Sequence, residues 1–215
     1  MLVDSRRGLV VSGSLLLGGL ALTLVVFHPA TGPTVQAVDD AVWEAAGSAR
    51  NAPATAVSEA LSVLGSAAVN WPLRIAALLL LAWRRHWLRA AAFSLAVVSS
   101  ELFIGPLKAA TDRMRPPGAL IETSAASFPS GHAIATAVTA VGLVLVLAAP
   151  GPSRWRWEVN AVVLTSVMAL SRVYLRAHWL SDTVAGALIG AGLALGWPAL
   201  LMAIRHRRDP AASTS

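Results

Sequence analysis

Apolar blocks long enough to cross a membrane dominate this sequence. A helix needs ~20 predominantly apolar residues to span the hydrocarbon core of a bilayer. Six blocks of roughly this length are present, at residues 8–27, 62–83, 90–107, 133–149, 159–175 and 183–204. With 56% hydrophobic and 13% charged residues, the chain is too apolar for an ordinary soluble domain. The sequence therefore predicts an all-α polytopic membrane protein with six transmembrane helices, folded as one domain over residues 1–215.

Two of these blocks allow another interpretation. Residues 62–83 contain Asn70, Pro72 and Arg74, so this block could instead be a half-buried helix whose arginine faces protein or water. Residues 8–27 could be a cleaved signal peptide. Signal sequences usually have a shorter apolar region, and no small-x-small cleavage site follows Phe27, which favours a retained helix.

The basic residues indicate how the chain is oriented in the membrane. The net charge is +6, but ten of the seventeen basic residues flank alternate membrane boundaries rather than forming a nucleic-acid site. These ten are Arg6, Arg7, Arg84, Arg85, Arg89, Arg154, Arg156, Arg205, Arg207 and Arg208. Under the positive-inside rule they mark the cytoplasmic side, together with both termini. The protein is therefore expected in the plasma membrane as a multi-pass protein with no nucleic-acid partner.

The segments between the blocks carry further signals. Residues 28–61 are expected on the extracytoplasmic side as two short amphipathic helices, 35–46 and 54–64, lying on the membrane surface. A mobile polar loop is the alternative for this region. Residues 108–132 include Pro116, Pro117, Gly118 and Pro129, so this segment cannot form one continuous helix.

Three short stretches combine the residues that phosphoryl chemistry requires. They are Lys108 with Arg115-Pro116, then Pro129-Ser130-Gly131-His132, and then Ser171-Arg172 with His178 and Asp182. Fixed cations match the oxygens of a phosphate dianion in charge and geometry. Two imidazoles and a carboxylate can supply a nucleophile, a proton donor and an orienting group. The expected topology places all three stretches on the extracytoplasmic face.

The order and spacing of these residues resemble the type-2 phosphatidic acid phosphatase family, which shares its site with the vanadium haloperoxidases. The family pattern is Lys-x6-Arg-Pro, Pro-Ser-Gly-His and Ser-Arg-x5-His-x3-Asp, and every fixed position is filled here between residues 108 and 182. The first hundred residues match only in general character. The resemblance implies an integral membrane enzyme that removes phosphate from lipids through a phosphohistidine intermediate.

The resemblance also implies roles for individual residues. His178 is the expected nucleophile, and Asp182, four residues later on the same helical face, would fix its tautomer. His132 is the expected general acid. Seen alone, the His178–Asp182 pair would be more simply explained as a helix-start aspartate beside an interfacial histidine. The phosphate is expected to be bound by a larger group: Lys108, Arg115, Ser130, Gly131 and Arg172.

Within that group, Ser130 could cap the following helix or bind a phosphate oxygen, and Gly131 would permit close backbone approach. No metal site and no cofactor are expected, because the cations fill the place of a metal and the chain has no cysteine.

Four charged residues have less certain roles. Asp112 could pair with Lys108 at i,i+4. Arg113 and Arg176 could meet a second phosphate or lipid headgroups, or simply reach the membrane interface. Glu101 lies in an apolar block, where a carboxylate is costly unless paired, and Arg74 is the candidate partner.

The expected activity is removal of a terminal phosphate from a lipid phosphate or diphosphate. Undecaprenyl diphosphate is the preferred substrate, and phosphatidic acid and phosphatidylglycerol phosphate are further candidates. Two alternatives stay open at the level of sequence. One is a phosphotransferase that passes the phosphate to a sugar or lipid hydroxyl, and the other is a non-catalytic protein that binds or translocates lipids.

Overall fold

The chain folds into helices throughout the part that the structure describes. The computed structural model describes residues 3–123 and 126–208, and these ranges hold eight α-helices and no β-strand. The helices are α1 (Ser5–Phe27), α2 (Gly32–Ser48), α3 (Ala52–Leu64), α4 (Ala67–Trp83), α5 (Trp87–Thr111), α6 (Gly131–Leu147), α7 (Arg154–Tyr174) and α8 (Leu180–Arg208). The predicted all-α fold class is confirmed for these ranges.

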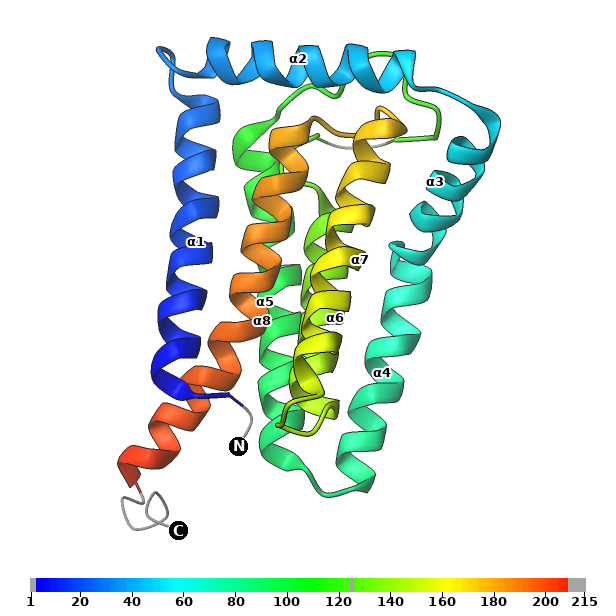
Figure 1. The fold of residues 1–215 in the computed structure, drawn as a ribbon. Helices are drawn as coiled ribbons and strands as arrows, with labels where there is room; N and C mark the ends of the chain where they lie inside the picture. Colours follow the sequence, from blue (N-terminus) through cyan, green and yellow to red (C-terminus); the bar gives the residue numbers. More distant parts are fainter. Residues whose placement is uncertain (1–2, 124–125, 209–215) are drawn as a thin grey trace.

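The long helices form a bundle that is closed at one end by α2. Helix α8 packs against α1, α5, α6 and α7, and α2 lies across the end of the bundle farthest from the two termini (Figure 1). Glycines bring α8 close to α6. A Cβ on Gly186 would lie 2.8 Å from the carbonyl oxygen of Ser130, and one on Gly190 would lie 2.7 Å from that of Ile134. Small residues of this kind let membrane helices approach closely.

The apolar surface of the bundle agrees with a membrane environment. Large hydrophobic side chains are exposed on its outer helices, including Leu17 and Leu24 on α1, Leu79 on α4 and Val162 on α7. Helices α1, α5 and α8 are long and apolar enough to cross a membrane, and the pair α3–α4 would add a fourth if it counts as one bent span. Helix α6 is apolar but has 17 residues. All six predicted blocks lie on helices, and six crossings remain a prediction.

The second predicted block, residues 62–83, is divided between two helices. Helix α3 ends at Leu64, α4 begins at Ala67, and the two are bent by 48°. The break is stabilised by Asn70, whose Nδ2 donates hydrogen bonds of 3.1 Å to the carbonyl oxygens of Leu64 and Ser66. The bond to Leu64 satisfies a carbonyl group that the end of α3 leaves without a helical partner, and the bond to Ser66 anchors the same side chain at the start of α4. The single span from residue 62 was therefore wrong at its start.

Arg74, inside α4, faces protein. Its side chain is 1% exposed, and its Nη1 donates a 2.7 Å hydrogen bond to Oε1 of Glu101 on α5. Its Nε also donates to Oγ1 of Thr139 on α6 at 2.9 Å. The pairing of Arg74 with Glu101 explains how both charges are accommodated in apolar helices.

The region between α1 and α4 is helical rather than a polar loop. Both amphipathic helices expected there are present as α2 and α3. Asn51 caps α3, because its side-chain oxygen accepts a 2.9 Å hydrogen bond from the amide of Ala54. Whereas α2 crosses the end of the bundle, α3 is inclined along its side toward α4 (Figure 1). This arrangement places α2 and α3 next to the loops that carry the predicted site.

The segment between α5 and α6 is irregular, as its prolines predicted. Helix α5 ends at Thr111, and Asp112 follows in the left-handed conformation with φ of 37°. The amide of Leu120 donates a 3.0 Å hydrogen bond to the carbonyl of Leu175, in the α7–α8 connection. The amide of Ser127 donates a 2.8 Å bond to the carbonyl of Arg113. The first bond joins the two connections at the α2 end of the bundle, and the second closes the α5–α6 connection on itself.

Candidate active site

The three motifs meet at the end of the bundle that α2 covers. Lys108 lies in the last turn of α5, and Arg115 lies in the connection that follows it. His132 lies in the first turn of α6, and Arg172 lies in the last turn of α7. The backbone amide of Ser130 donates a 3.0 Å hydrogen bond to the carbonyl of Asp182, which ties the second motif to the third.

His178 and Asp182 face each other, as their i,i+4 spacing predicted. Nδ1 of His178 lies 3.6 Å from Oδ2 of Asp182, slightly too far for a hydrogen bond, and this buried nitrogen has no other hydrogen-bond partner in the described chain. Asp182 is fully buried, and its Oδ2 accepts hydrogen bonds from the Trp179 amide at 2.9 Å and from the Ser127 hydroxyl. A shift of a few tenths of an ångström would complete the His178–Asp182 bond.

Burial keeps the imidazole of His178 neutral. It lowers the pKa of His178 to about 4, although Asp182 acts in the opposite direction. The neutral ring retains a lone pair at neutral pH, which a nucleophile requires. The second ring nitrogen, Nε2, lies 3.3 Å from Nη1 of Arg115. The nitrogen that does not face Asp182 is therefore directed at one of the predicted phosphate-binding cations.

Arg115 lies beside this nitrogen, Lys108 shares a carbonyl with Arg115, and neutral oxygen atoms are acceptors for all three predicted phosphate-binding cations. Nζ of Lys108 donates to the carbonyl of Ala126 at 2.5 Å, and Nη2 of Arg115 reaches the same carbonyl at 3.4 Å. Nη1 of Arg172 donates to the hydroxyl of Ser62 at 2.5 Å, and its buried Nε has no partner in the described chain. Grouped cations whose acceptors are mostly uncharged favour an anion.

The second motif contributes a helix start with open space beside it. Ser130 caps α6, since its Oγ accepts a 3.4 Å hydrogen bond from the amide of Ala133. A Cβ placed on Gly131 would meet no atom within 4 Å beyond its neighbours in the chain. The amides at a helix N-terminus together with the helix dipole bind anions. Gly131 therefore leaves room for a phosphate to approach the start of α6.

His132 is held by α3. Its Nε2 lies 3.1 Å from the carbonyl oxygen of Ser62. Because a carbonyl can only accept a hydrogen bond, Nε2 must carry the proton in this arrangement. Ser62 thus contacts both His132 and Arg172, through its backbone and its side chain respectively. Ser62 gives no signal in the sequence, because serine is common in such helices and carries no recognisable spacing.

The sequence of residues 87–206 matches that of the PAP2 superfamily. This region covers more than half of the chain and includes all eight predicted site residues, whereas Ser62 precedes it. The chain belongs to the PAP2 superfamily. The family predicted from the three motifs is therefore confirmed, and with it the enzyme class, a hydrolase of phosphate esters.

Similar proteins fall into the same class. The chain is 35% identical to an undecaprenyl-diphosphatase of Sulfolobus acidocaldarius over 65 residues, which is 30% of this chain and 29% of that protein. It is 32% identical to the decaprenylphosphoryl-5-phosphoribose phosphatase of Mycobacterium tuberculosis over 143 residues, 63% of this chain and 74% of that protein.

Solved structures show the same fold. The PAP2-type phosphatidylglycerolphosphate phosphatase of Bacillus subtilis superposes with a TM-score of 0.75 and 28% identity, covering 91% of this chain and 96% of that one. LpxE of Aquifex aeolicus superposes with a TM-score of 0.58 and 20% identity, covering 71% of this chain and 89% of that one. The second likeness concerns the fold alone.

Arg113 has a different place in this PAP2 protein from the one expected. The sequence suggested contact with a second phosphate, a lipid headgroup or the membrane interface. Instead, Nη1 of Arg113 donates a 2.6 Å hydrogen bond to Oδ1 of Asp182, and its Nη2 donates a 2.8 Å bond to Oδ2 of Asp39 on α2. Asp39 was not singled out, because one of two adjacent acidic residues on an amphipathic helix looks like a solvated charge.

One further expectation for the charged residues was not met, and the phosphate, headgroup or interface contact expected of Arg176 stays a prediction. Asp112 forms no ion pair with Lys108 in the described chain, because it adopts the left-handed conformation just past α5 while Nζ of Lys108 turns to Ala126. The guanidinium of Arg176 lies 3.8 Å from the ring centroid of Trp43 on α2, a cation–π contact. The expected absence of a metal stays a prediction.

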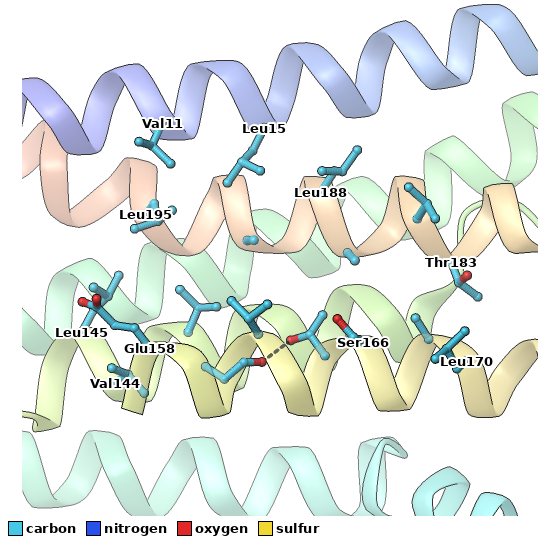
Figure 2. A pocket seen from close by; sticks show the side chains of 18 of the residues that line it. Val11, Leu15, Val144, Leu145, Glu158, Ser166, Leu170, Thr183, Leu188 and Leu195 are labelled. Carbon is cyan, nitrogen blue, oxygen red and sulfur yellow. Dashed lines mark hydrogen bonds between the residues drawn. The ribbon is translucent and has the colours of Figure 1, made fainter. Parts of the chain in front are cut away.

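An apolar cavity of about 670 Å³ lies beside the site rather than within it. Figure 2 shows its side chains, which come from α1 (Val11, Leu15), α8 (Leu188, Leu195) and α7 (Ser166, Leu170), with α6 behind. None of the eight predicted site residues lines it, although Thr183, the residue after Asp182, does. The cavity is thus separate from the eight predicted site residues, which lie at the α2 end of the bundle.

Proposed function

We propose that this PAP2 protein removes the terminal phosphate from a polyprenyl lipid phosphate or diphosphate, through a phosphohistidine formed on His178. One observation carries the proposal. The lone pair available on the neutral His178 ring, at Nε2, faces a group of cations that contact mainly neutral oxygens, beside the open start of α6.

The first step is attack of Nε2 of His178 on the terminal phosphorus, which breaks the bond to the leaving oxygen. Asp182 stabilises the positive charge that develops on the ring, because its Oδ2 faces Nδ1. Lys108, Arg115 and Arg172 neutralise the phosphoryl oxygens in the transition state. His132, as an imidazolium protonated on both ring nitrogens, supplies a proton to the leaving oxygen. Burial and the charge of Arg172 lower the pKa of His132 to about 4, and the negative charge of the bound phosphate counteracts this shift.

The second step is hydrolysis of the phosphohistidine. Water attacks the phosphorus with its proton passing to His132, the nitrogen–phosphorus bond breaks, and free phosphate leaves. His132, neutral after the first step, thereby regains its imidazolium form, and His178 returns to its neutral form. All the charge compensation comes from side chains, so the proposed reaction needs no divalent cation.

The polyprenyl substrate class is supported by relatives whose names refer to undecaprenyl diphosphate and to a decaprenylphosphoryl sugar phosphate. Both substrates carry a long isoprenoid chain and a terminal phosphate. Undecaprenyl diphosphate is our first candidate. Phosphatidylglycerol phosphate is the competing candidate, because the structural relative from Bacillus subtilis acts on it by name.

The direct test is phosphate release by the purified protein in detergent. The substrates are undecaprenyl diphosphate, a decaprenylphosphoryl sugar phosphate, phosphatidylglycerol phosphate and phosphatidic acid, each with and without a metal chelator. We expect the two polyprenyl substrates to have the highest kcat/KM and the chelator to have no effect. A clear preference for glycerolipids would overturn the substrate class. Formation of a new phosphate ester with an added sugar or lipid alcohol would instead identify a phosphotransferase.

We also propose that the site faces away from the cytoplasm. The α4–α5 and α6–α7 connections, which carry or adjoin basic residues such as Arg84, Arg85 and Arg154, lie at the end of the bundle opposite α2 (Figure 1). The positive-inside rule assigns that end to the cytoplasm. A membrane-impermeant thiol reagent should label Leu120→Cys in intact cells and should not label His86→Cys. The reverse pattern would invert the topology.

A further inference from the structure

Helix α2 reaches the site through one buried acid. Asp39 is 2% exposed, although α2 lies on the outside of the bundle. Its Oδ1 accepts a 2.9 Å hydrogen bond from the backbone amide of Ser181, and its Oδ2 accepts a 2.5 Å bond from the Ser181 hydroxyl. Ser181 is the residue before Asp182 and lies in the first turn of α8. Asp39 therefore fixes the helix start that carries the proposed partner of His178.

Arg113 joins Asp39 to Asp182. Its two terminal nitrogens bind different carboxylates, Nη1 at 2.6 Å from Asp182 and Nη2 at 2.8 Å from Asp39. The guanidinium also donates to Oγ of Ser181 and Oε1 of Gln36, each at 2.7 Å. The side chains of Arg113, Asp39 and Asp182 are 10%, 1% and 0% exposed. A planar guanidinium can hold two carboxylates in a fixed relation, which a lysine ammonium does less well.

This arrangement decides which oxygen of Asp182 is available to His178. Arg113 takes Oδ1, so Oδ2 is the oxygen that faces Nδ1 of His178. Two buried carboxylates and one guanidinium carry a net negative charge, an arrangement that is costly unless every group is well bonded. Here the hydrogen bonds of Arg113 and Ser181 provide this bonding. The cluster is thus a poor source of stability but a rigid support for one carboxylate.

We propose that Asp39 and Arg113 are positioning residues, which hold Asp182 in the orientation that orients and stabilises the His178 ring. The inference rests on the proposed function, because it assigns these residues to the same phosphohistidine reaction. It makes α2 a part of the active site, although neither Asp39 nor Arg113 contacts the phosphate-binding cations in the described structure. It also predicts that their loss reduces kcat rather than phosphate binding.

The test compares two variants with a matched control. Asp39→Asn removes the negative charge while keeping the shape of the side chain. Arg113→Lys keeps the positive charge but loses the planar guanidinium that contacts both carboxylates. Glu44→Gln removes one negative charge from an exposed position of the same helix. Loss of an orienting group behind a reactive residue typically costs ~10–100-fold in activity. We expect kcat to fall by about that factor in both variants, with KM and vanadate inhibition nearly unchanged, and the control to match the wild type.

Two further measurements separate positioning from folding. Rates are divided by the number of vanadate-binding sites, because only folded protein binds vanadate and unfolded protein is thereby left out of the rate. The double variant Asp39→Asn/Asp182→Asn should be scarcely slower than Asp182→Asn alone, because residues acting through one group are not additive. If Asp39→Asn fails to fold, Arg113→Lys combined with Asp182→Asn gives the same comparison.

The outcomes are distinct. Two results would overturn the positioning role and leave the proposed function intact. One is a wild-type kcat per vanadate-binding site in Asp39→Asn and Arg113→Lys. The other is a double variant whose loss of kcat equals the product of the losses in the two single variants. A wild-type protein that releases phosphate from no lipid phosphate or diphosphate would overturn the proposed function and this inference with it.

Discussion

Replacing Asp182 with asparagine tests the centre of the proposed mechanism. The carboxylate accepts hydrogen bonds from Arg113 at Oδ1 and from the Trp179 amide and Ser127 hydroxyl at Oδ2. Asparagine has only one oxygen. The charged donor, Arg113, forms the stronger hydrogen bond, so the amide oxygen should stay at the position of Oδ1. The amide NH₂ then takes the place of Oδ2, 3.6 Å from Nδ1 of His178.

This exchange reverses the tautomer of the nucleophile. An NH₂ group facing Nδ1 favours an imidazole with its lone pair on Nδ1 and its proton on Nε2. Nε2, the nitrogen directed at Arg115, would then have no lone pair for attack on phosphorus. Defects of proton placement typically cost ~10²–10⁴-fold in rate. At 1.36 kcal/mol for each factor of ten, we expect Asp182→Asn to raise the barrier by ~3–5 kcal/mol.

The assay is steady-state phosphate release from the best lipid substrate, expressed per vanadate-binding site. Vanadate should still bind, because Lys108, Arg115 and Arg172 do not hydrogen-bond to Asp182 in the described structure. The loss of activity should lie between those of His132→Ala and His178→Ala. A kcat within about threefold of wild type, a change below 1 kcal/mol, would refute the argument that Asp182 sets the tautomer.

Three further predictions follow from the geometry. His178→Ala should abolish turnover for every substrate. His132→Ala should retain more activity on p-nitrophenyl phosphate than on a lipid phosphate, because the p-nitrophenolate leaving group needs little protonation. Trapping an acid-labile, base-stable phosphoenzyme on His178→Ala would contradict this division of roles. Burial lowers the pKa of His178 to about 4, so the ring gains a proton only as pH falls toward that value. The fall of kcat/KM at acid pH should therefore have its midpoint well below pH 6.5, once the titration of the substrate phosphate, measured by phosphorus NMR, has been subtracted. A midpoint at pH 6.5 would show that the ring is not buried in the working enzyme. Glu101→Gln leaves the buried Arg74 without its charged partner and should destabilise the protein by ~1–3 kcal/mol in thermal unfolding. The loss should exceed that of Glu158→Gln, which removes the i,i+4 partner of Arg154, because the Glu158 carboxylate is 52% exposed; equal losses would contradict this ranking.

Much of the site was predictable because its residues follow fixed local rules. The i,i+4 spacing of His178 and Asp182 predicted that the two side chains meet, and they do, although His178 lies in the connection two residues before α8 rather than on the helix itself. The prolines after Lys108 exclude a helix, so the connection had to turn back at the same end of the bundle as His132. These inferences need only backbone geometry and the alternation of membrane sides.

The remaining features depend on contacts between distant segments. Asp39 and Arg113 are 74 residues apart, and nothing in the spacing of either indicates the other. The start of α4 depends on Asn70 bonding back to Leu64, whereas the sequence showed only a polar residue in an apolar block. For Ser130 the local contact with the Ala133 amide shows a cap, and phosphate binding by its hydroxyl stays a prediction.

The contacts of Ser62 bear on how tightly a substrate can be held. Its hydroxyl accepts a hydrogen bond from Nη1 of Arg172, and its carbonyl accepts one from Nε2 of His132. A phosphate that binds Arg172 therefore exchanges one protein hydrogen bond for another, instead of stripping water from a fully hydrated cation. Since a charged acceptor forms the stronger bond with guanidinium, the exchange favours the dianion and discriminates against neutral headgroups. When the product leaves, Ser62 can re-form its hydrogen bonds to Arg172 and His132 at once. Helix α3 can therefore assist release at the same points where the phosphate is bound.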